Sequence, residues 1–315
     1  MSITKKFLLK LSILIVFIIF SDLFFGHILQ ALYFKAKYNE IYTTNQIVNK
    51  IDDDVLIFGS SRASHHYVPS ILSDSLKMSV FNCGRDKQCI YYYYGLFMKV
   101  TERYLPKLII LDIFPSDYNR SIYSIDGMKE LAPYYGSNKE LDSLIYLINP
   151  LEKYKMISML YRYNSRIVDI LGDIFIKIDR NWENGYIPFF DQMNPVNLIE
   201  PVNKSKPIIE PEKLVYLEKF ISFCKQNNIP IFICISPIYS SGNCDYSEDF
   251  LPLENIAEKY HVPIFNHTCN PLFSKNNSLF KDGLHLNHEG ATLYSSIIGQ
   301  EIKTYLENNH SPGKN

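Results

Sequence analysis

The chain has 315 residues, 47% of them hydrophobic, which is enough length and apolar surface for one large α/β domain with an appendage. Its formal net charge of -1 at pH 7, without a long basic run, argues against a protein that binds nucleic acid. The 24 tyrosines and 20 phenylalanines suit either a core or a carbohydrate-binding surface, because aromatic side chains are both bulky and amphipathic.

The N-terminal segment predicts a membrane anchor. Residues 7–29 are apolar with few interruptions, and about 20 such residues in a helix cross the hydrocarbon core of a bilayer. A cleaved signal peptide is the alternative, because residues 11–20 have the length of a signal h-region. No small-x-small cleavage site follows, however, and the apolar pattern resumes at Leu23, so we expect residues 1–30 to stay attached.

The charges around this segment predict its orientation. Lys5, Lys6 and Lys10 lie on its N-terminal side, and Asp22 lies near its other end. Because positive residues favour the cytoplasmic side, we expect a single-pass protein of the cytoplasmic membrane with its large domain on the extracytoplasmic side. Residues 31–53 are polar and read as a helical or extended connector that lifts the domain off the membrane.

Short apolar runs alternate with helical patterns along the rest of the chain. Strands are expected at 55–58, 79–84, 108–112, 229–237 and 262–265, and helices at 69–76, around 91–94, and at 211–226, 253–260 and 290–306. This alternation predicts a three-layer α/β/α domain with a five-stranded parallel sheet over residues 54–306. Residues 307–315 form a polar tail.

Between about residues 120 and 210 the pattern loosens, which predicts an insertion in the domain. Residues 144–176 have helical apolar spacing, whereas residues 181–206 are rich in Asn and Pro and hold the one tryptophan, Trp182. A long irregular segment in a compact domain is typically functional or poorly ordered.

The six cysteines lack zinc spacing, because the sequence contains no C-x-x-C pair. Cys244 and Cys269 follow two successive predicted strands, and outside the cytoplasm they could form a disulfide.

Two polar stretches could carry chemistry. Gly59, Ser60, Ser61 and Arg62 follow the first strand, at the strand end where ligands of parallel sheets bind. Further along, Asp282 stands three residues before His285 ahead of a helix, so its carboxylate could orient the imidazole to take a proton from a serine. A capped turn before a helix is the simpler alternative for this second stretch.

With these residues in place, the chain resembles the SGNH, or GDSL-like, hydrolases, in a divergent membrane-anchored branch. Gly59-Ser60-Ser61 stands where the family has G-D-S, which implies that Ser61 is the nucleophile. The block from Asp282 to Gly290 matches D-x-x-H-P-N-x-x-G except that Leu286 replaces the proline, which implies His285 as base and Asp282 as its partner. The resemblance implies a flavodoxin-like SGNH fold.

The resemblance also implies an oxyanion hole. Gly84, in Asn82-Cys83-Gly84, fits the second block, whose glycine contributes a backbone N–H beside that of Ser61. In the third block, Ser116 stands where the family has an asparagine donor. Loss of one such donor typically lowers the rate by about 10² to 10³. The Ser116 hydroxyl stands at the position of the missing asparagine and can also donate, so it is the candidate third donor.

Several neighbours have two interpretations. Arg62 could bind a substrate carboxylate or phosphate, or it could brace a loop. His65 and His66 could compete for the role of base, but we expect them on the surface or rim. Trp182 and Tyr186 could stack on a sugar, or they could pack the insertion.

A metal site made of Asp282, His285 and His288 is possible on spacing, but no further ligand cluster supports it. We therefore predict neither a metal nor a cofactor.

The predicted function is a serine esterase or O-acyltransferase that acts on ester groups, in particular O-acetyl groups, of a cell-surface or exported polysaccharide. The alternative is a non-catalytic accessory or binding subunit of an envelope polysaccharide system. Either function would suit a partnership with a membrane-bound O-acyltransferase.

Overall fold

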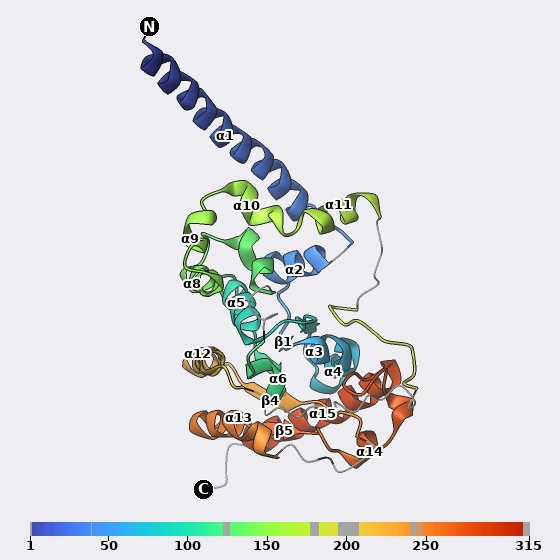
Figure 1. The fold of residues 1–315 in the computed structure, drawn as a ribbon. Helices are drawn as coiled ribbons and strands as arrows, with labels where there is room; N and C mark the ends of the chain where they lie inside the picture. Colours follow the sequence, from blue (N-terminus) through green and yellow to red (C-terminus); the bar gives the residue numbers. More distant parts are fainter. Residues whose placement is uncertain are drawn as a thin grey trace. The chain divides into compact units, whose positions relative to one another are not determined.

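The computed structural model describes residues 2–38, 40–121, 127–176, 183–194, 208–240, 244 and 247–310 (Figure 1). They form two compact units. The first combines Met1–Lys50 with Met128–Arg180, and the second combines Ile51–Gly127 with Asn181–Asn315. The predicted insertion is therefore divided between the two units.

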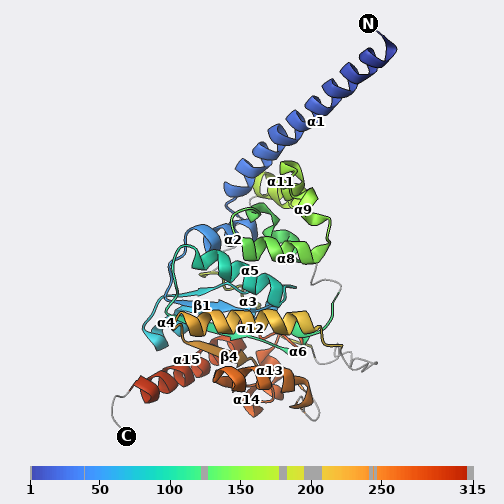
Figure 2. The ribbon, with the colours of Figure 1, turned by 90° about the vertical axis from the view of Figure 1, so that its left-hand side faces the viewer.

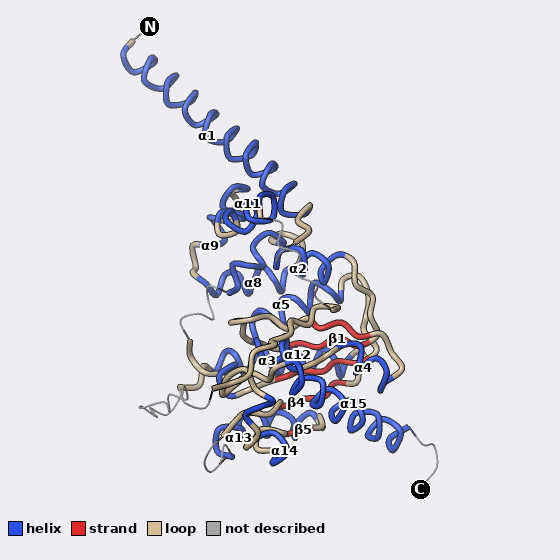
Figure 3. The backbone as a smooth tube through the Cα atoms, turned by 90° about the vertical axis from the view of Figure 1, so that its right-hand side faces the viewer, coloured by secondary structure: helices blue, strands red, loops and turns tan. Residues whose placement is uncertain are grey.

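The second unit is built on a parallel sheet of five strands, as predicted (Figure 3). The spatial order is β2-β1-β3-β4-β5, which is the flavodoxin-like order. Val55 lies opposite Val80 on one side and Leu108 on the other. The strands are β1 (Val55–Phe58), β2 (Val80–Asn82), β3 (Leu108–Asp112), β4 (Ile231–Ile235) and β5 (Ile264–Asn266).

Helices cover both faces of this sheet, which confirms the three-layer α/β/α architecture. Alternate strand residues, such as Val55, Ile57 and Ile110, pack with α3 (Ser61–His66), α4 (Pro69–Leu76) and α15 (His288–His310). The remaining residues face α5 (Ile90–Thr101) and α12 (Pro211–Gln226), which lie together over one face (Figure 2). Because each strand is buried on both faces, its sequence is continuously apolar.

Aromatic packing holds the second of these layers. The rings of Phe58, Phe97 and Phe220 contact one another, and Phe97 stacks on Phe220 with ring centroids 4.2 Å apart. The four consecutive tyrosines at 91–94 are all buried and add to this packing.

Predicted helix bounds hold best where a proline begins the helix. Helices α4 and α12 start at Pro69 and Pro211 and match their predicted ranges. Helix α13 (Ser247–Tyr260) begins earlier than predicted, and α15 extends at both ends. The remaining short helices of this unit are α6 (Pro115–Tyr118), α14 (Pro271–Ser274) and η3 (Asn277–Leu279).

Cys244 and Cys269 form a disulfide, which confirms the pairing considered from the sequence. The other four cysteines are buried thiols. Burial raises the pKa of the Cys83 and Cys234 thiols well above the usual value, which keeps them protonated.

The first unit is helical. Its longest element, α1 (Ile3–Phe34), is long and apolar enough to cross a bilayer. The other elements are α2 (Glu40–Asn49), η1 (Met128–Tyr134), α8 (Lys139–Ile148), α9 (Glu152–Lys155), α10 (Met159–Asn164) and α11 (Ile167–Phe175).

The predicted connector is not a simple spacer. Helix α2 within it buries Ile41, Ile47 and Val48 in the first unit. The Asn45 amide donates to the Tyr33 carbonyl at the end of α1, at 2.8 Å, and accepts from the Tyr134 hydroxyl at 2.7 Å. Residues after the anchor are therefore part of a folded core.

Candidate active site

A glycine lets the chain turn from β1 into the short helix α3. Gly59 has φ +154°, and a Cβ at this position would lie 2.7 Å from the carbonyl oxygen of Asp112. Glycine alone fits such close backbone approach without strain. The turn makes Ser61 the first residue of α3, at the carboxyl end of the sheet.

Ser61, His285 and Asp282 form a continuous hydrogen-bonded set. Ser61 Oγ lies 2.8 Å from His285 Nε2, and His285 Nδ1 lies 2.9 Å from both Asp282 carboxylate oxygens. Because a carboxylate only accepts, Nδ1 carries the proton and Nε2 is left to accept from the Ser61 hydroxyl. This arrangement can increase the nucleophilicity of a serine.

The turn before α15 preorganises this set. Asp282 Oδ1 accepts from the backbone N–H groups of Leu284 and His285, at 2.9 and 3.0 Å. Burial by itself raises the pKa of Asp282, but the hydrogen bonds from His285 and from the backbone outweigh it. The net pKa is therefore lower than usual, and the carboxylate stays charged beside the imidazole.

His65 is buried, which contradicts its expected place on the surface. Its Nδ1 lies 2.6 Å from the Ile187 carbonyl and its Nε2 lies 3.2 Å from Asp86, and the ring stacks on Phe189. Because both ring nitrogens are engaged by these acceptors, His65 is not placed to take a proton from Ser61. Burial by itself raises the pKa of Asp86, but the hydrogen bonds from His65 and Ser64 lower it to about 2.

His66 is also fully buried, so its predicted surface position is wrong too. Its Nε2 accepts from the Leu286 N–H at 3.0 Å, which leaves Nδ1 to donate to Ser236 Oγ at 2.8 Å. Burial, and then the nearby Arg62, lower the pKa of His66 well below its usual value, so the ring is neutral. With both nitrogens of His65 and His66 occupied, the geometry favours His285 as the base.

The bond to His66 gives a physical reason for the leucine in the Asp282–Gly290 block. Proline has no backbone N–H and could not donate to His66. Leu286 supplies that N–H directly after His285, and its side chain is buried in the core. The leucine at this position thus couples the turn that holds His285 to the helix that begins with Ser61.

Arg62 points into the protein. Its Nε lies 3.5 Å from Asp112 Oδ1, its guanidinium also donates to the Ser236 carbonyl, and it lies over the Phe114 ring. With 3% of its surface exposed, Arg62 braces the site, and the structure favours this over contact with a substrate. Sequence reasoning missed Asp112 and Ser236, although both directly follow or end apolar strands.

The expected oxyanion donors differ in availability. The Ser61 N–H lies at the start of α3, whereas the Gly84 N–H already donates a hydrogen bond to Asn82 Oδ1 at 2.9 Å. A Cβ on Gly84 would lie 2.4 Å from the Ser64 nitrogen, so glycine lets this loop pack on α3. Ser116 is exposed on α6. Gly84 N–H would have to leave Asn82 to reach a substrate oxygen.

Asp117, next to Ser116, is a buried structural group. Its carboxylate accepts from the Phe114 N–H at 2.7 Å and from the Tyr93 hydroxyl at 2.9 Å. Burial raises the pKa of Asp117 to about 7 despite these hydrogen bonds. Asp117 therefore fixes the short helix α6, which carries Ser116.

Two aromatic residues that the sequence reasoning did not single out, Phe189 and Phe190, lie near the site. Trp182 lies outside the described residues, and Tyr186 is 1% exposed in the core, where its hydroxyl lies 3.1 Å from His288 Nδ1. The structure favours the packing alternative for Tyr186. Phe189 approaches His285, with ring centroids 6.0 Å apart, and the exposed Phe190 approaches His288.

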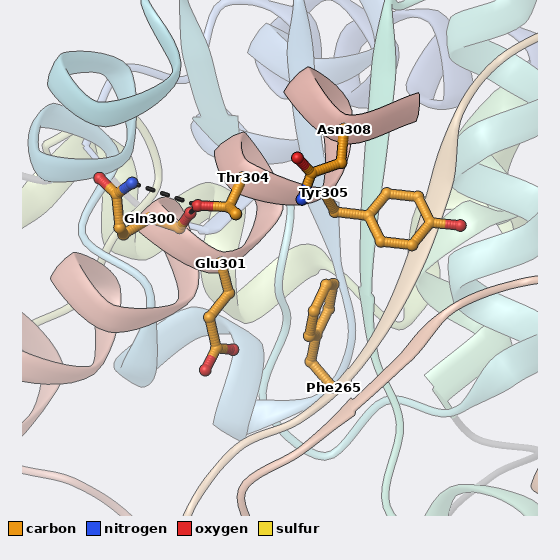
Figure 4. A pocket seen from close by; sticks show the side chains of 6 residues that line it. All are labelled: Phe265, Gln300, Glu301, Thr304, Tyr305 and Asn308. Atoms are coloured by element: carbon orange, nitrogen blue, oxygen red, sulfur yellow. Dashed lines mark hydrogen bonds between the residues drawn. The ribbon is translucent and has the colours of Figure 1, made fainter. Parts of the chain in front are cut away.

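A pocket of about 420 Å³ lies elsewhere, between β5 and α15 (Figure 4). Phe265, Glu301 and Tyr305 are among the residues that line it, and neither Ser61 nor His285 does. Among the residues that the structure describes, no group of three or more His, Cys, Asp or Glu side chains could hold a metal ion.

No family model matches the sequence. No curated protein matches it either. Solved structures with a similar fold include a lipolytic protein of the G-D-S-L family from Desulfitobacterium hafniense DCB-2, at 10% identity and TM-score 0.39, covering 78% of this chain and 98% of that chain. An acylhydrolase from Bacteroides fragilis NCTC 9343 has 13% identity and TM-score 0.42, covering 85% of this chain and 97% of that chain.

A family two carbohydrate esterase from Clostridium thermocellum, solved with cellohexaose, has 10% identity and TM-score 0.40. The match covers 80% of this chain and 64% of that chain. These similarities concern the chain path alone, so the function proposed below rests on the geometry of the site.

The contribution of the hydrogen bond from the Leu286 N–H to His66 Nε2 can be tested by measuring the free energy of unfolding of variants. Leu286→Pro should lower the free energy of unfolding by about 1–3 kcal/mol more than Leu286→Val, because proline leaves the buried His66 Nε2 without its donor. Valine is the matched control, since it has a similar volume and keeps the N–H. In a His66→Phe background, denaturant unfolding should show a much smaller difference between the two variants. An equal difference in both backgrounds would contradict the coupling.

The raised pKa of Asp117 predicts a pH dependence of stability. Between about pH 4 and pH 7, the folded protein keeps a proton that the unfolded chain has released, so this group lowers the stability as pH rises. Asp117→Asn should remove that contribution and change the slope by up to about 1.4 kcal/mol per pH unit in denaturant titrations. The exposed Asp74→Asn serves as the control. If the Asp117→Asn and wild-type slopes are parallel, Asp117 is ionised in the folded protein.

Proposed function

We propose that this protein is a serine ester hydrolase or O-acyltransferase of the SGNH type. The proposal rests on the 2.8 Å contact between Ser61 Oγ and His285 Nε2, with Asp282 bonded to the other ring nitrogen. The set lies where parallel α/β sheets bind their substrates. The resemblance of the sequence blocks adds independent support.

In the proposed mechanism, Ser61 Oγ attacks the ester carbonyl while His285 Nε2 takes the hydroxyl proton. Asp282 stabilises the resulting imidazolium through Nδ1–H. When the tetrahedral intermediate collapses, the bond to the alcohol breaks and His285 returns the proton to that alcohol. Water or a sugar hydroxyl then gives its proton to His285 and attacks the acyl-serine. When this second intermediate collapses, the bond between the acyl carbon and Ser61 Oγ breaks, His285 returns the proton to Ser61 Oγ, and the carboxylic acid or new ester leaves.

The charge on the intermediate needs aimed donors. The Ser61 N–H is the first, and the Gly84 N–H becomes the second if it turns away from Asn82. The Ser116 hydroxyl, on a loop held by the buried Asp117, is the proposed third donor.

The substrate class is an acylated carbohydrate, most simply an O-acetyl ester on a cell-surface or exported polysaccharide. Phe189 and the exposed Phe190 are suited to contact a sugar face, because they lie beside His285 and His288. Hydrolysis and transfer differ only in whether water or a sugar hydroxyl attacks the acyl-serine.

The proposed location is the extracytoplasmic side of the cytoplasmic membrane, with α1 crossing the bilayer once. Lys5, Lys6 and Lys10 favour a cytoplasmic N-terminus. The disulfide between Cys244 and Cys269 favours an oxidising compartment for the large domain. A membrane-bound O-acyltransferase is the proposed partner if the reaction is a transfer.

One observation favours a second candidate, a non-catalytic accessory subunit that binds an envelope polysaccharide. The Gly84 N–H is occupied by Asn82. A domain without turnover would have no need of this donor.

An active-site probe separates the two candidates. A fluorophosphonate should label the purified full chain, and Ser61→Ala should abolish labelling, because the probe forms its bond with an activated serine. Ser60→Ala is the matched control and should still be labelled. His285→Ala should lower the hydrolysis of an acetyl ester by about 10³-fold or more. Binding of a polysaccharide with neither labelling nor hydrolysis would favour the accessory subunit.

The third oxyanion donor has its own test. Ser116→Ala should lower kcat for an acetyl ester by about 10²-fold with little change in KM, because the donor acts on charge that develops in the transition state. Ser116→Thr keeps a hydroxyl and should retain most of the activity. Equal kcat values for the alanine variant and the wild type would exclude Ser116 from the oxyanion hole.

A further inference from the structure

The first unit exposes large apolar side chains on helices α9 to α11 and the residues beside them. Ile157 is 72% exposed, Val168 80% and Phe175 78%. Large exposed apolar side chains that lie close together in the sequence, as here, are typical of an interaction surface. We call it the apolar platform, and it is defined by Tyr154, Ile157, Val168, Leu171, Phe175 and Ile176.

Helix α11 uses its charged residues within the unit. Asp173 accepts from the backbone N–H groups of Lys37 and Tyr38, with the shortest contact at 2.7 Å, and Asp169 pairs with Arg166 at 3.1 Å. Val168, Leu171 and Phe175, at helical spacing, face outward instead. A helix that faces water would instead expose charged residues and bury apolar ones. The arrangement in α11 is therefore typical of a surface that contacts an apolar medium.

The platform has a defined place along α1. Asp22, a charge within the apolar helix, accepts from the N–H groups of Met159 and Leu160 at the start of α10, at 2.9 and 3.1 Å. One turn later, a Cβ on Gly26 would lie 2.5 Å from Met159 Cβ, so glycine lets the two helices touch. Helix α10 is therefore attached to α1 at residues 22–26.

That attachment lies about one bilayer thickness from Phe7, where the apolar segment begins. From Phe7 to Gly26 the helix rises by roughly 28 Å, at about 1.5 Å per residue. The hydrocarbon core of a bilayer is about 30 Å thick. Helix α10, which lies in the chain between Ile157 and Val168 of the platform, is then held near the boundary between acyl chains and headgroups on the far side.

We propose that the apolar platform is a lipid-binding surface that lies in the interface of the same bilayer that α1 crosses. The inference rests on the proposed membrane span of α1 and adds a second contact with lipid. The first unit then contacts the bilayer through the platform as well as through α1.

Neighbouring residues favour lipid as the occupant. Past Asp22, the side chains of Leu23, Phe24, Phe25 and Ile28 on α1 remain exposed, so the apolar surface of the helix continues beyond the residues that contact α10. Lys153 lies over the Tyr154 ring, with Nζ 4.8 Å from its centroid. Paired lysine and tyrosine are typical of membrane interfaces, where the ring and the lysine stem meet lipid and the ammonium group meets water.

Single-tryptophan variants test this surface in the full chain. In a Trp182→Phe background, reconstituted in phosphatidylcholine vesicles, Phe175→Trp reports on the platform and Phe17→Trp reports on the middle of α1. Phe190→Trp is the matched control, because its native ring is 77% exposed in the second unit. Bromine on the lipid acyl chains quenches a tryptophan in the bilayer, and acrylamide quenches one in water.

Quenching of Phe175→Trp by brominated lipid should exceed that of Phe190→Trp several-fold, most strongly with bromine near the glycerol. Quenching of Phe17→Trp should be strongest with bromine near the chain ends. Acrylamide quenching of Phe175→Trp equal to that of Phe190→Trp would overturn the platform, and so would protection from both quenchers, which indicates covering by protein. Absence of lipid quenching in Phe17→Trp would instead overturn the span of α1, and with it the platform.

Discussion

The buried ion pair between Arg62 and Asp112 is the constraint on which the candidate site depends. It joins the helix that begins with Ser61 to the end of β3, and the Arg62 guanidinium reaches on to the Ser236 carbonyl beyond β4. Asp112 also accepts from the Tyr67 hydroxyl at 2.6 Å and from the Ser236 N–H at 3.2 Å. Removing one partner of such a pair typically costs about 3–5 kcal/mol, because a charge is left buried without compensation.

Three histidines near this pair, His65, His66 and His285, differ in their roles because their hydrogen-bond partners differ. His65 contacts the Ile187 carbonyl and Asp86 and holds the segment around Ile187, whereas His66 accepts from the Leu286 N–H and holds the turn that carries His285. Of the three, His285 is the one that faces the Ser61 hydroxyl. The site is thus held by backbone contacts from separate loops, which keeps the serine and the imidazole within reach of each other.

The strands and several helices could be predicted because each depends on local pattern. Continuous apolar runs marked β1, β3 and β4, and prolines marked the starts of α4 and α12. The predictions failed where burial depends on distant residues. His65 and His66 are polar and follow a loop, so they read as surface residues, yet Asp86 and Ser236 supply partners that make their burial possible. For the same reason the sequence could not decide whether Tyr186 contacts a sugar or packs in the core, because the core around it comes from distant segments.

By itself, the sequence determined the α/β architecture, the apolar helix at the N-terminus, and the candidates Ser61, Asp282 and His285, because strand and helix periodicity and short motifs are properties of neighbouring residues. Only the tertiary structure decided which histidine faces Ser61, that Arg62 points inward, that Gly84 N–H is occupied, and that residues 128–176 fold with α1. These outcomes depend on contacts between residues far apart in the chain. Local pattern cannot specify such contacts, because the same residue type is stable on the surface or in the core according to the partner that it meets there.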